Sequence, residues 1–435
     1  MSAPDAGSAR FLKWAPWHAP AASAAVRERV AEMLAAIERG GERALRRYSA
    51  ELDGWSPDSF VVEGDELRRA SAELADELAE HIAFALEQVR GFAHAQRATL
   101  LDLELETLPG VTLGHRHIPV GAVGAYVPGG RYPMLASALM TVSVAKVAGV
   151  AHVTACAPPR GGKGIDPAML HAMASAGADQ VLCLGGVQAL AAMAFGLCGA
   201  EPADMLVGPG NAYVAEAKRQ LYGTVGIDLP AGPTEVAVIA DDTADAGRVA
   251  ADLLGQAEHG PTSPALLIST SGPFARAVLA AIEALLPEWP TRDVAGVAWR
   301  DHGSVAVVDG DEAAMRLADR YAPEHLEVHV GESKLDAYLH GLRNYGALFL
   351  GPEATVAYGD KAAGTNHVLP TLGAARFTGG LWVGTFLKTC TYQRLTPLGT
   401  RAIAPAVAAI SHAEGFAGHA RTAELRLAAA EEGSA

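Results

Sequence analysis

Two polar side chains near the middle of the chain have the spacing of a shared binding site. Gln256 and His259 are three residues apart, so on a helix they point from one face toward a common atom. Distant segments offer a carboxylate at Asp360 and an imidazole at His419. Imidazole and carboxylate groups suit Zn²⁺, whereas a Gln oxygen is a less common ligand. These four residues form a candidate catalytic zinc set; the alternative is that Gln256 and His259 are polar residues that cap a loop.

The adjacent pair Glu324 and His325 could supply acid–base chemistry. Side chains of neighbouring residues diverge, so each group would have its own task rather than share one proton. Histidine is the side chain most easily poised near neutral pH, which favours His325 as a general base. The alternative is an exposed pair at the start of a strand that follows Pro323.

Three glycine-containing turns could hold a nucleotide. Residues 208–211 (Gly-Pro-Gly-Asn) follow an expected strand and open a helix, where backbone N–H groups can hold phosphate. Residues 126–130 and 185–188 lie at comparable strand ends, and ligands of open α/β sheets bind at the carboxyl ends of strands. None is a full G-x-G-x-x-G motif, so each could also be a simple turn.

Composition and charge narrow the class of protein. The 435 residues carry a formal charge of −15, from 34 basic and 49 acidic side chains, which disfavours nucleic acid as a partner but allows a small anionic substrate. Neither a signal peptide nor an apolar run of membrane-spanning length is apparent. The four cysteines lack C-x-x-C spacing, and we expect reduced packing residues in a cytoplasmic protein.

Hydrophobic periodicity predicts an α/β fold with two Rossmann-like βαβ domains and a cleft between them. Residues 26–48 and 65–103 have helical spacing, and residues 115–127 read as extended. Short apolar strands alternating with Ala-rich helices indicate parallel βαβ units. The expected strands are 153–156, 181–184, 205–207, 236–239, 265–268, 305–308, 326–330 and 347–350.

The length predicts more than one domain. We expect an N-terminal tail over residues 1–25 and a first α/β domain that combines N-terminal helices, 26–114, with 235–375. Residues 115–234 form the second α/β domain, on the nucleotide side. Residues 376–435 lose the strand pattern and form a C-terminal helical arm.

The motifs taken together resemble the histidinol dehydrogenase family from about residue 26 to 419. They occur in one order and at matching separations along the chain. The segments that carry the resemblance are 126–130 (Tyr-Val-Pro-Gly-Gly), 145–150, 208–214, 231–235, 256–259, 322–325 and 364–371.

This resemblance implies an NAD- and zinc-dependent homodimer that oxidises a primary alcohol to an aldehyde and then to a carboxylate. One Zn²⁺ per subunit would be held by Gln256, His259, Asp360 and His419, which also bind substrate. His325 matches the general base and Glu324 the residue that activates water. Tyr126, Gln188 and Asn211 match positions that contact NAD. Glu414 and His419 would come from the partner subunit's C-terminal arm, and Thr234 matches a substrate-binding serine.

Departures from the family pattern gather around the expected substrate. Ala136 and Thr234 stand where the family has serines, Lys361 replaces a tyrosine, and Arg131-Tyr132 replaces small residues. The two added cations favour an anionic substrate over the cationic histidinol, and the pattern looks like the sulfopropanediol dehydrogenase branch. We expect Arg131 or Lys361 to bind the sulfonate of 2,3-dihydroxypropane-1-sulfonate, with 3-sulfolactate as product.

Other functions stay open at this point. L-histidinol dehydrogenase is the first alternative, which the retained Glu414 favours and which Ala136 and Lys361 oppose. A zinc- and nucleotide-binding protein without turnover and a zinc hydrolase are the alternatives of other classes. The expected partners are a small polar alcohol and a second copy of the chain, with no nucleic acid and no membrane.

Overall fold

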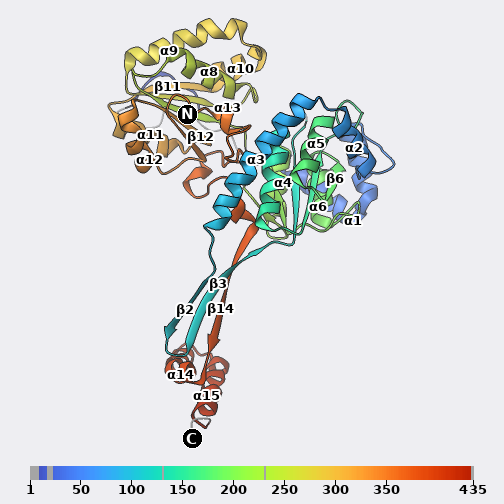
Figure 1. Cartoon of the computed structure of the whole chain (residues 1–435), viewed down its shortest axis with the longest axis vertical. Helices are drawn as coiled ribbons and strands as arrows, with labels where there is room; N and C mark the ends of the chain where they lie inside the picture. The colour runs from blue at the N-terminus through green and yellow to red at the C-terminus, as the bar shows by residue number, and fades with distance from the viewer. Residues whose placement is uncertain (1–8, 17–22, 130–131, 230–231, 433–435) are drawn as a thin grey trace.

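Two α/β halves and a projecting arm make up the structure (Figure 1). It is a computed structural model that describes residues 9–16, 23–129, 132–229 and 232–432. The predicted α/β class with two Rossmann-like sheets is confirmed. In the described part of the chain, no helix is both long and apolar enough to cross a membrane.

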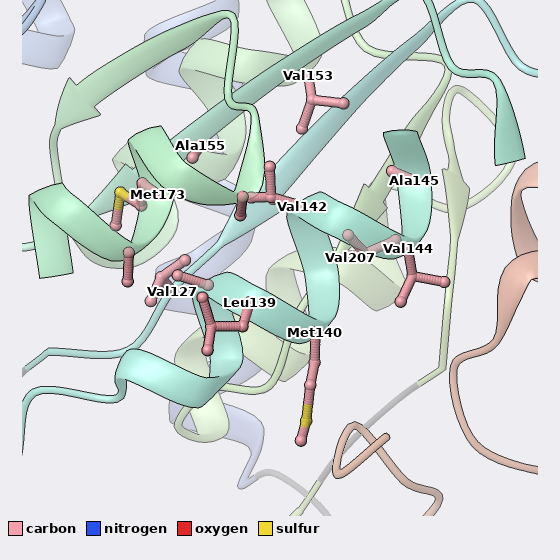
Figure 2. Close-up of a cluster of buried hydrophobic side chains, with 14 of the residues drawn as sticks. Val127, Leu139, Met140, Val142, Val144, Ala145, Val153, Ala155, Met173 and Val207 are labelled. Atoms are coloured by element: carbon pink, nitrogen blue, oxygen red, sulfur yellow. The ribbon is translucent and has the colours of Figure 1, made fainter. Parts of the chain in front are cut away.

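The first half is built on a five-stranded parallel sheet of order β6-β5-β4-β7-β8. Its helix α4 is buried on nearly all sides, and Leu139, Met140, Val142 and Val144 pack in one buried cluster with strand residues such as Val153 (Figure 2). The strands are β4 (Ala122–Tyr126), β5 (His152–Ala157), β6 (Gln180–Cys183), β7 (Met205–Val207) and β8 (Gly226–Ile227), and the helices are α4 (Leu135–Ala148), α5 (Pro167–Ala176), α6 (Gly186–Phe195) and α7 (Ala212–Leu221).

A six-stranded sheet of order β1-β11-β10-β9-β12-β13 forms the second half. All its pairings are parallel except that of β1 (Arg10–Lys13), a strand within the predicted N-terminal tail that pairs antiparallel with β11. The other strands are β9 (Val236–Ala240), β10 (Ala265–Ser269), β11 (Gly303–Val307), β12 (His325–His329) and β13 (Ala347–Leu350). The helices are α8 (Ala246–Ala257), α9 (Gly272–Leu285), α10 (Arg292–His302), α11 (Asp311–Tyr321), α12 (Leu335–Gly341) and α13 (Val356–Gly359), and 3₁₀ turns occur at η1 (Leu286–Glu288), η2 (Glu332–Lys334) and η3 (Ala374–Arg376). A further 3₁₀ turn, η4 (Val383–Phe386), packs on α4 of the five-stranded half.

The N-terminal helices cover the five-stranded sheet. Helix α1 (Ala24–Asp53) packs on α6 and α7, α2 (Gly64–Glu73) on α5, and α3 (Asp76–Ala98) on α4. Apolar residues of α1 such as Ile37 and Leu45 join a core cluster with residues of β6 and α6. The predicted division grouped residues 26–114 with 235–375, whereas helices α1, α2 and α3 pack on the five-stranded half. The domain boundaries themselves stay a prediction.

The arm contains a three-stranded antiparallel sheet as well as helices. Its strands β2 (Leu103–Leu108), β3 (Val111–Pro119) and β14 (Leu387–Leu395) carry α14 (Pro397–Ala413) and α15 (Ala417–Glu432) away from both halves (Figure 1). The helical arm expected for 376–435 is present, but the expected loss of the strand pattern there was wrong for β14. That strand has only exposed and half-buried residues, so it lacks the apolar run that marks the other strands. All four cysteines are free, as expected, although Cys198 and Cys390, the latter on β14, are only half-buried.

Candidate active site

The candidate catalytic residues lie at the amino ends of strands in the six-stranded sheet. Thr234 precedes β9, Glu324 and His325 stand at the start of β12, and Gln256 is in the last turn of α8 before β10. Strands β9 and β12 are paired so that Val236 lies opposite His325, which brings Thr234 and Glu324 together. Asp360 follows α13 and reaches the same place. The site is therefore assembled from four segments of one sheet edge.

A chain of short hydrogen bonds orients Glu324. The Thr234 hydroxyl donates to Glu324 Oε2 at 2.5 Å, and the backbone N–H of Glu235 donates to the same oxygen at 2.9 Å. The Gln256 amide nitrogen donates to Thr234 Oγ1 at 2.6 Å. Because its nitrogen is used in this way, Gln256 has its carbonyl oxygen left for a ligand, and Glu324 has its Oε1 left for a proton.

The His325 imidazole is held in one orientation by a backbone carbonyl. Its Nδ1 lies 3.1 Å from Glu235 O, an acceptor that requires the proton on Nδ1 and leaves Nε2 with a free lone pair in the neutral ring. Nε2 is buried, has no hydrogen-bond partner and faces Asp360 Oδ1 at 3.4 Å. Burial alone would lower the pKa of His325, but the carboxylates of Glu324 and Asp360 outweigh it and raise that pKa well above its ordinary value.

Three of the four expected zinc ligands come together within this chain. His259 Nε2 lies 3.9 Å from Asp360 Oδ2, and Gln256 Nε2 lies 3.4 Å from His325 Nδ1 in the same cluster. Burial lowers the pKa of His259, which favours the neutral imidazole that binds metals. Burial would raise the pKa of Asp360, but its contact with His325 outweighs this and holds it below its usual range. A neutral imidazole, a carboxylate and an amide oxygen fit a zinc site that lacks one ligand.

The remaining expected ligand is not brought to this cluster. His419 is an exposed residue of α15, and Glu414 is an exposed residue at the end of α14. Both lie at the far end of the arm from α8 and β12 (Figure 1). One copy of the chain therefore brings together only three of the four expected ligands.

The expected NAD contacts lie at the carboxyl ends of the five-stranded sheet. Tyr126 ends β4 and its hydroxyl accepts from Gly186 N at 3.3 Å, at the start of α6. Gln188, only 1% exposed, donates to Asp53 Oδ2 at 2.7 Å and keeps its carbonyl oxygen buried and without a partner. Asn211 caps α7 through Tyr213 N at 3.0 Å. This edge is where open α/β sheets bind ligands, and the orphaned Gln188 oxygen fits a bound group that donates a hydrogen bond.

Of the two side chains expected to bind the anionic group of the substrate, the structure describes only Lys361. Arg131 lies outside the described residues. Lys361 follows Asp360 directly, is exposed and forms no ion pair with a described residue. It is close enough to contribute, as a minor cause, to the lowered pKa values of His259 and Asp360. Ala136 is buried in α4.

Sequence reasoning did not single out two buried groups beside these sites. His367 joins the halves, because its Nε2 lies 2.8 Å from Ser137 Oγ on α4 and its Nδ1 lies 3.0 Å from Asp360 O. The 364–371 motif contained the signal for it. Lys218 forms a fully buried ion pair with Asp228, and its Nζ also donates to Gly208 O at 3.0 Å. Nothing in the local sequence marks that pair.

A cavity of about 810 Å³ lies next to this site rather than in it. It is lined by residues of both halves, among them Phe92 of α3, Phe349 of β13, Tyr358 and Trp382, and it reaches Gly359, the neighbour of Asp360. The Phe349 ring lies 6.1 Å from the His325 ring, so an aromatic wall separates the cavity from the imidazole. The predicted cleft between the halves is thus present beside the polar cluster.

Comparisons with known proteins identify the family to which this chain belongs. A sequence model of the family described as Histidinol dehydrogenase matches residues 18–427. A histidinol dehydrogenase homolog from Ruegeria pomeroyi is 54% identical, and a sulfopropanediol 3-dehydrogenase from the same organism is 48% identical, each over 96% of both chains. The crystal structure of histidinol dehydrogenase from Elizabethkingia anophelis superposes with a TM-score of 0.90 at 34% identity over 95% of both chains. The chain belongs to the histidinol dehydrogenase family, oxidoreductases that act on CH–OH donors, use NAD and bind zinc.

Proposed function

We propose that this protein oxidises 2,3-dihydroxypropane-1-sulfonate to 3-sulfolactate in the cytoplasm, through a bound aldehyde and with two NAD. The observation that carries the proposed chemistry is the buried His325, whose Nδ1 is fixed by Glu235 O while Nε2 is free and faces Asp360. The imidazole is held in one tautomer, and its unprotonated nitrogen lies beside a candidate metal ligand. This arrangement suits the removal of a proton from a hydroxyl group.

In the first oxidation His325 Nε2 accepts the hydroxyl proton, and the carbon that bears this hydroxyl would give up a hydride to bound NAD. Gln256, His259 and Asp360 would hold zinc together with His419 of the partner subunit. Bound zinc would supply positive charge that orients the alcohol and opposes the carboxylates of Glu324 and Asp360, which raise the pKa of His325.

The second oxidation needs water added to the aldehyde. Glu324 takes both its hydrogen bonds on Oε2, from Thr234 and from the Glu235 backbone, so Oε1 can accept a proton from the attacking water. Once His325 has released its first proton to solvent and NADH has been exchanged for a second NAD, the hydrate would lose a hydroxyl proton to His325 and a hydride to that NAD. Thr234 acts by holding Glu324 and Gln256 in place. NAD would be held by Tyr126, Gln188 and Asn211.

The anionic substrate is supported by the cations and by one relative. Lys361 lies beside Asp360 with no ion pair among the described residues. The 48% identity to a sulfopropanediol 3-dehydrogenase extends over almost the whole chain. Arg131 remains the second candidate for binding the sulfonate. Its planar guanidinium would donate two parallel hydrogen bonds, whereas a lysine ammonium acts as a point charge.

Counting NADH tests the proposed reaction. The zinc-loaded enzyme is given a limiting amount of the (R)- or the (S)-diol sulfonate, and L-histidinol in parallel. About two NADH per diol consumed, with little from histidinol, is the expected result. Turnover of histidinol alone would establish the second candidate, L-histidinol dehydrogenase, which Glu414 favours. No NADH from any of these substrates would contradict both and leave a protein without this turnover.

The cations are tested by substitution with methionine. Loss of a charge-assisted contact of about 1.5–3 kcal/mol predicts that Lys361→Met or Arg131→Met raises KM for the sulfonate about tenfold or more. Lys163→Met, at an exposed lysine on a turn of the five-stranded half, is the control and should change nothing. Unchanged KM in both test variants would refute the assignment of the sulfonate site.

We also propose that each site is completed by the partner subunit, since His419 and Glu414 lie on the projecting arm. His259→Asn and His419→Asn should each be inactive. Mixing the two with subunit exchange should restore about a quarter of the activity, because half the dimers are mixed and one of their two sites is intact. No recovery after proven exchange would show that both histidines act within one chain.

A further inference from the structure

A second group of metal-ligating side chains lies deeper along the same sheet. His325, Glu327 and His329 alternate on β12, so they point to one face, and Asp252 of α8 faces the last two. His329 Nε2 lies 3.3 Å from Glu327 Oε2 and 3.8 Å from Asp252 Oδ2. Ligand atoms around a tetrahedral Zn²⁺ with bonds of about 2.0–2.1 Å are about 3.3 Å apart. The two distances to His329 are therefore close to this spacing, and all three ligand atoms lie within 4.8 Å of one another.

Two hydrogen bonds from outside the group aim the carboxylates inward. The Thr355 hydroxyl donates to Asp252 Oδ1 at 3.0 Å, and the backbone N–H of Val356 donates to Glu327 Oε1 at 2.8 Å. Each donor takes one oxygen and leaves the other, Oδ2 or Oε2, directed at His329. Such outer hydrogen bonds are what orient carboxylate ligands in metal sites.

Among the described residues, no lysine or arginine forms an ion pair with this group. Glu327 is fully buried, His329 is 3% exposed, and the Asp252 side chain is 18% exposed. The nearest cation on α8 is Arg248, but its guanidinium pairs with Glu353 at 2.9 Å in solvent. Burial, followed by the neighbouring Glu327, raises the pKa of Asp252 to about 6. Two buried carboxylates next to one imidazole are costly unless a cation or a proton joins them.

We propose that Asp252, Glu327 and His329 bind a second divalent cation, of the zinc class, separate from the metal of the candidate active site. One imidazole and two carboxylates suit Zn²⁺, whereas Mg²⁺ and Ca²⁺ take oxygen ligands. The partly exposed Asp252 side is where the ion enters and where water completes its coordination.

This ion would stabilise the segments that carry the catalytic groups. Asp252 is one helical turn before Gln256, Glu327 is two residues after His325, and Val356 is four residues before Asp360. A cation at the second site thus ties together the three segments that carry those catalytic groups. Its removal is expected to weaken zinc binding at the first site by 10- to 100-fold, as loss of an outer-shell partner does.

Metal content tests the proposal without relying on activity. The full chain is stripped with a chelator, reloaded with excess Zn²⁺, passed over a sizing column and assayed for zinc. We expect about two zinc ions per chain in the wild type, one in His329→Gln and one in His259→Asn. His340→Gln, at an exposed histidine of α12, is the matched control and should keep two.

Anomalous diffraction at the zinc edge locates the ions in the wild-type protein, so the test survives if a variant fails to fold. A peak between Asp252, Glu327 and His329 would establish the site. One zinc per chain with no peak there would overturn the proposal and leave a shared proton as the neutralising group. The proposed reaction fails or succeeds separately, by the NADH count of the wild-type enzyme.

Discussion

Gly208 is the residue whose change best tests the proposed cofactor edge. It has φ +112°, and a Cβ placed there would lie 2.1 Å from the carbonyl oxygen of Tyr126, whereas real contacts stay above 3.0 Å. Gly208→Ala must therefore push the 208–211 turn or the end of β4 by roughly 1 Å, and such a misplacement can lower a rate by about 10²-fold. Because Tyr126 and Asn211 flank the contact, we expect kcat/KM for NAD to fall by that factor.

Gly223→Ala is the matched control for backbone strain. Gly223 has nearly the same φ, +105°, but no atom lies within 4 Å of its added Cβ. Both variants carry the strain of a positive φ, about 1–3 kcal/mol, and only Gly208→Ala carries the collision. Initial rates at varied NAD and saturating alcohol, with thermal midpoints of both variants, separate the two effects. Equal kcat/KM for NAD in the two variants would refute the placement of the cofactor at this turn.

Two further changes test buried charges. Lys218→Met should lower stability by about 3–5 kcal/mol, because it leaves Asp228 charged and buried; chemical denaturation measures this, and Lys218→Met/Asp228→Leu should recover part of the loss. Burial alone would raise the pKa of the Asp241 carboxyl. Hydrogen bonds from Thr243 and Lys334 outweigh burial and lower this pKa below its ordinary value of 3.8. Its contribution is full above pH 3.8 and is lost as pH falls through the lower folded value. Asp241→Asn should therefore destabilise by about 1.5–3 kcal/mol at pH 7 and converge with the wild type in acid; a gap independent of pH would contradict this.

Most of the parallel strands could be predicted because they are buried on both faces. Segments such as β5, β9 and β10 are continuous apolar runs between helices, a pattern with few other solutions. Strand β14 has no such run, because its neighbours in the arm leave both faces to solvent. The apolar faces of α1 and α3 predicted helices, but a helix face does not specify which of two sheets it covers.

The site was predictable where a motif marked it and not where only folding creates it. Gln256, Glu324, His325 and Asp360 do meet, as the family motifs implied. The alternation of His325 with Glu327 and His329 is visible in the sequence, yet their approach to Asp252 depends on how α8 lies over β12. Long-range contacts of this kind leave no periodic trace in a single chain.

Polar and apolar side chains alternate along β12, and this alternation constrains the number of residues in the strand as well as their types. Leu326 and Val328 point into the apolar layer on the opposite side from His325, Glu327 and His329. A one-residue deletion at the start of the strand would exchange the two sets, placing polar groups in the core and leucine at the catalytic position. Over evolutionary time this segment can therefore change by substitution, whereas insertions and deletions must be confined to the loops on either side.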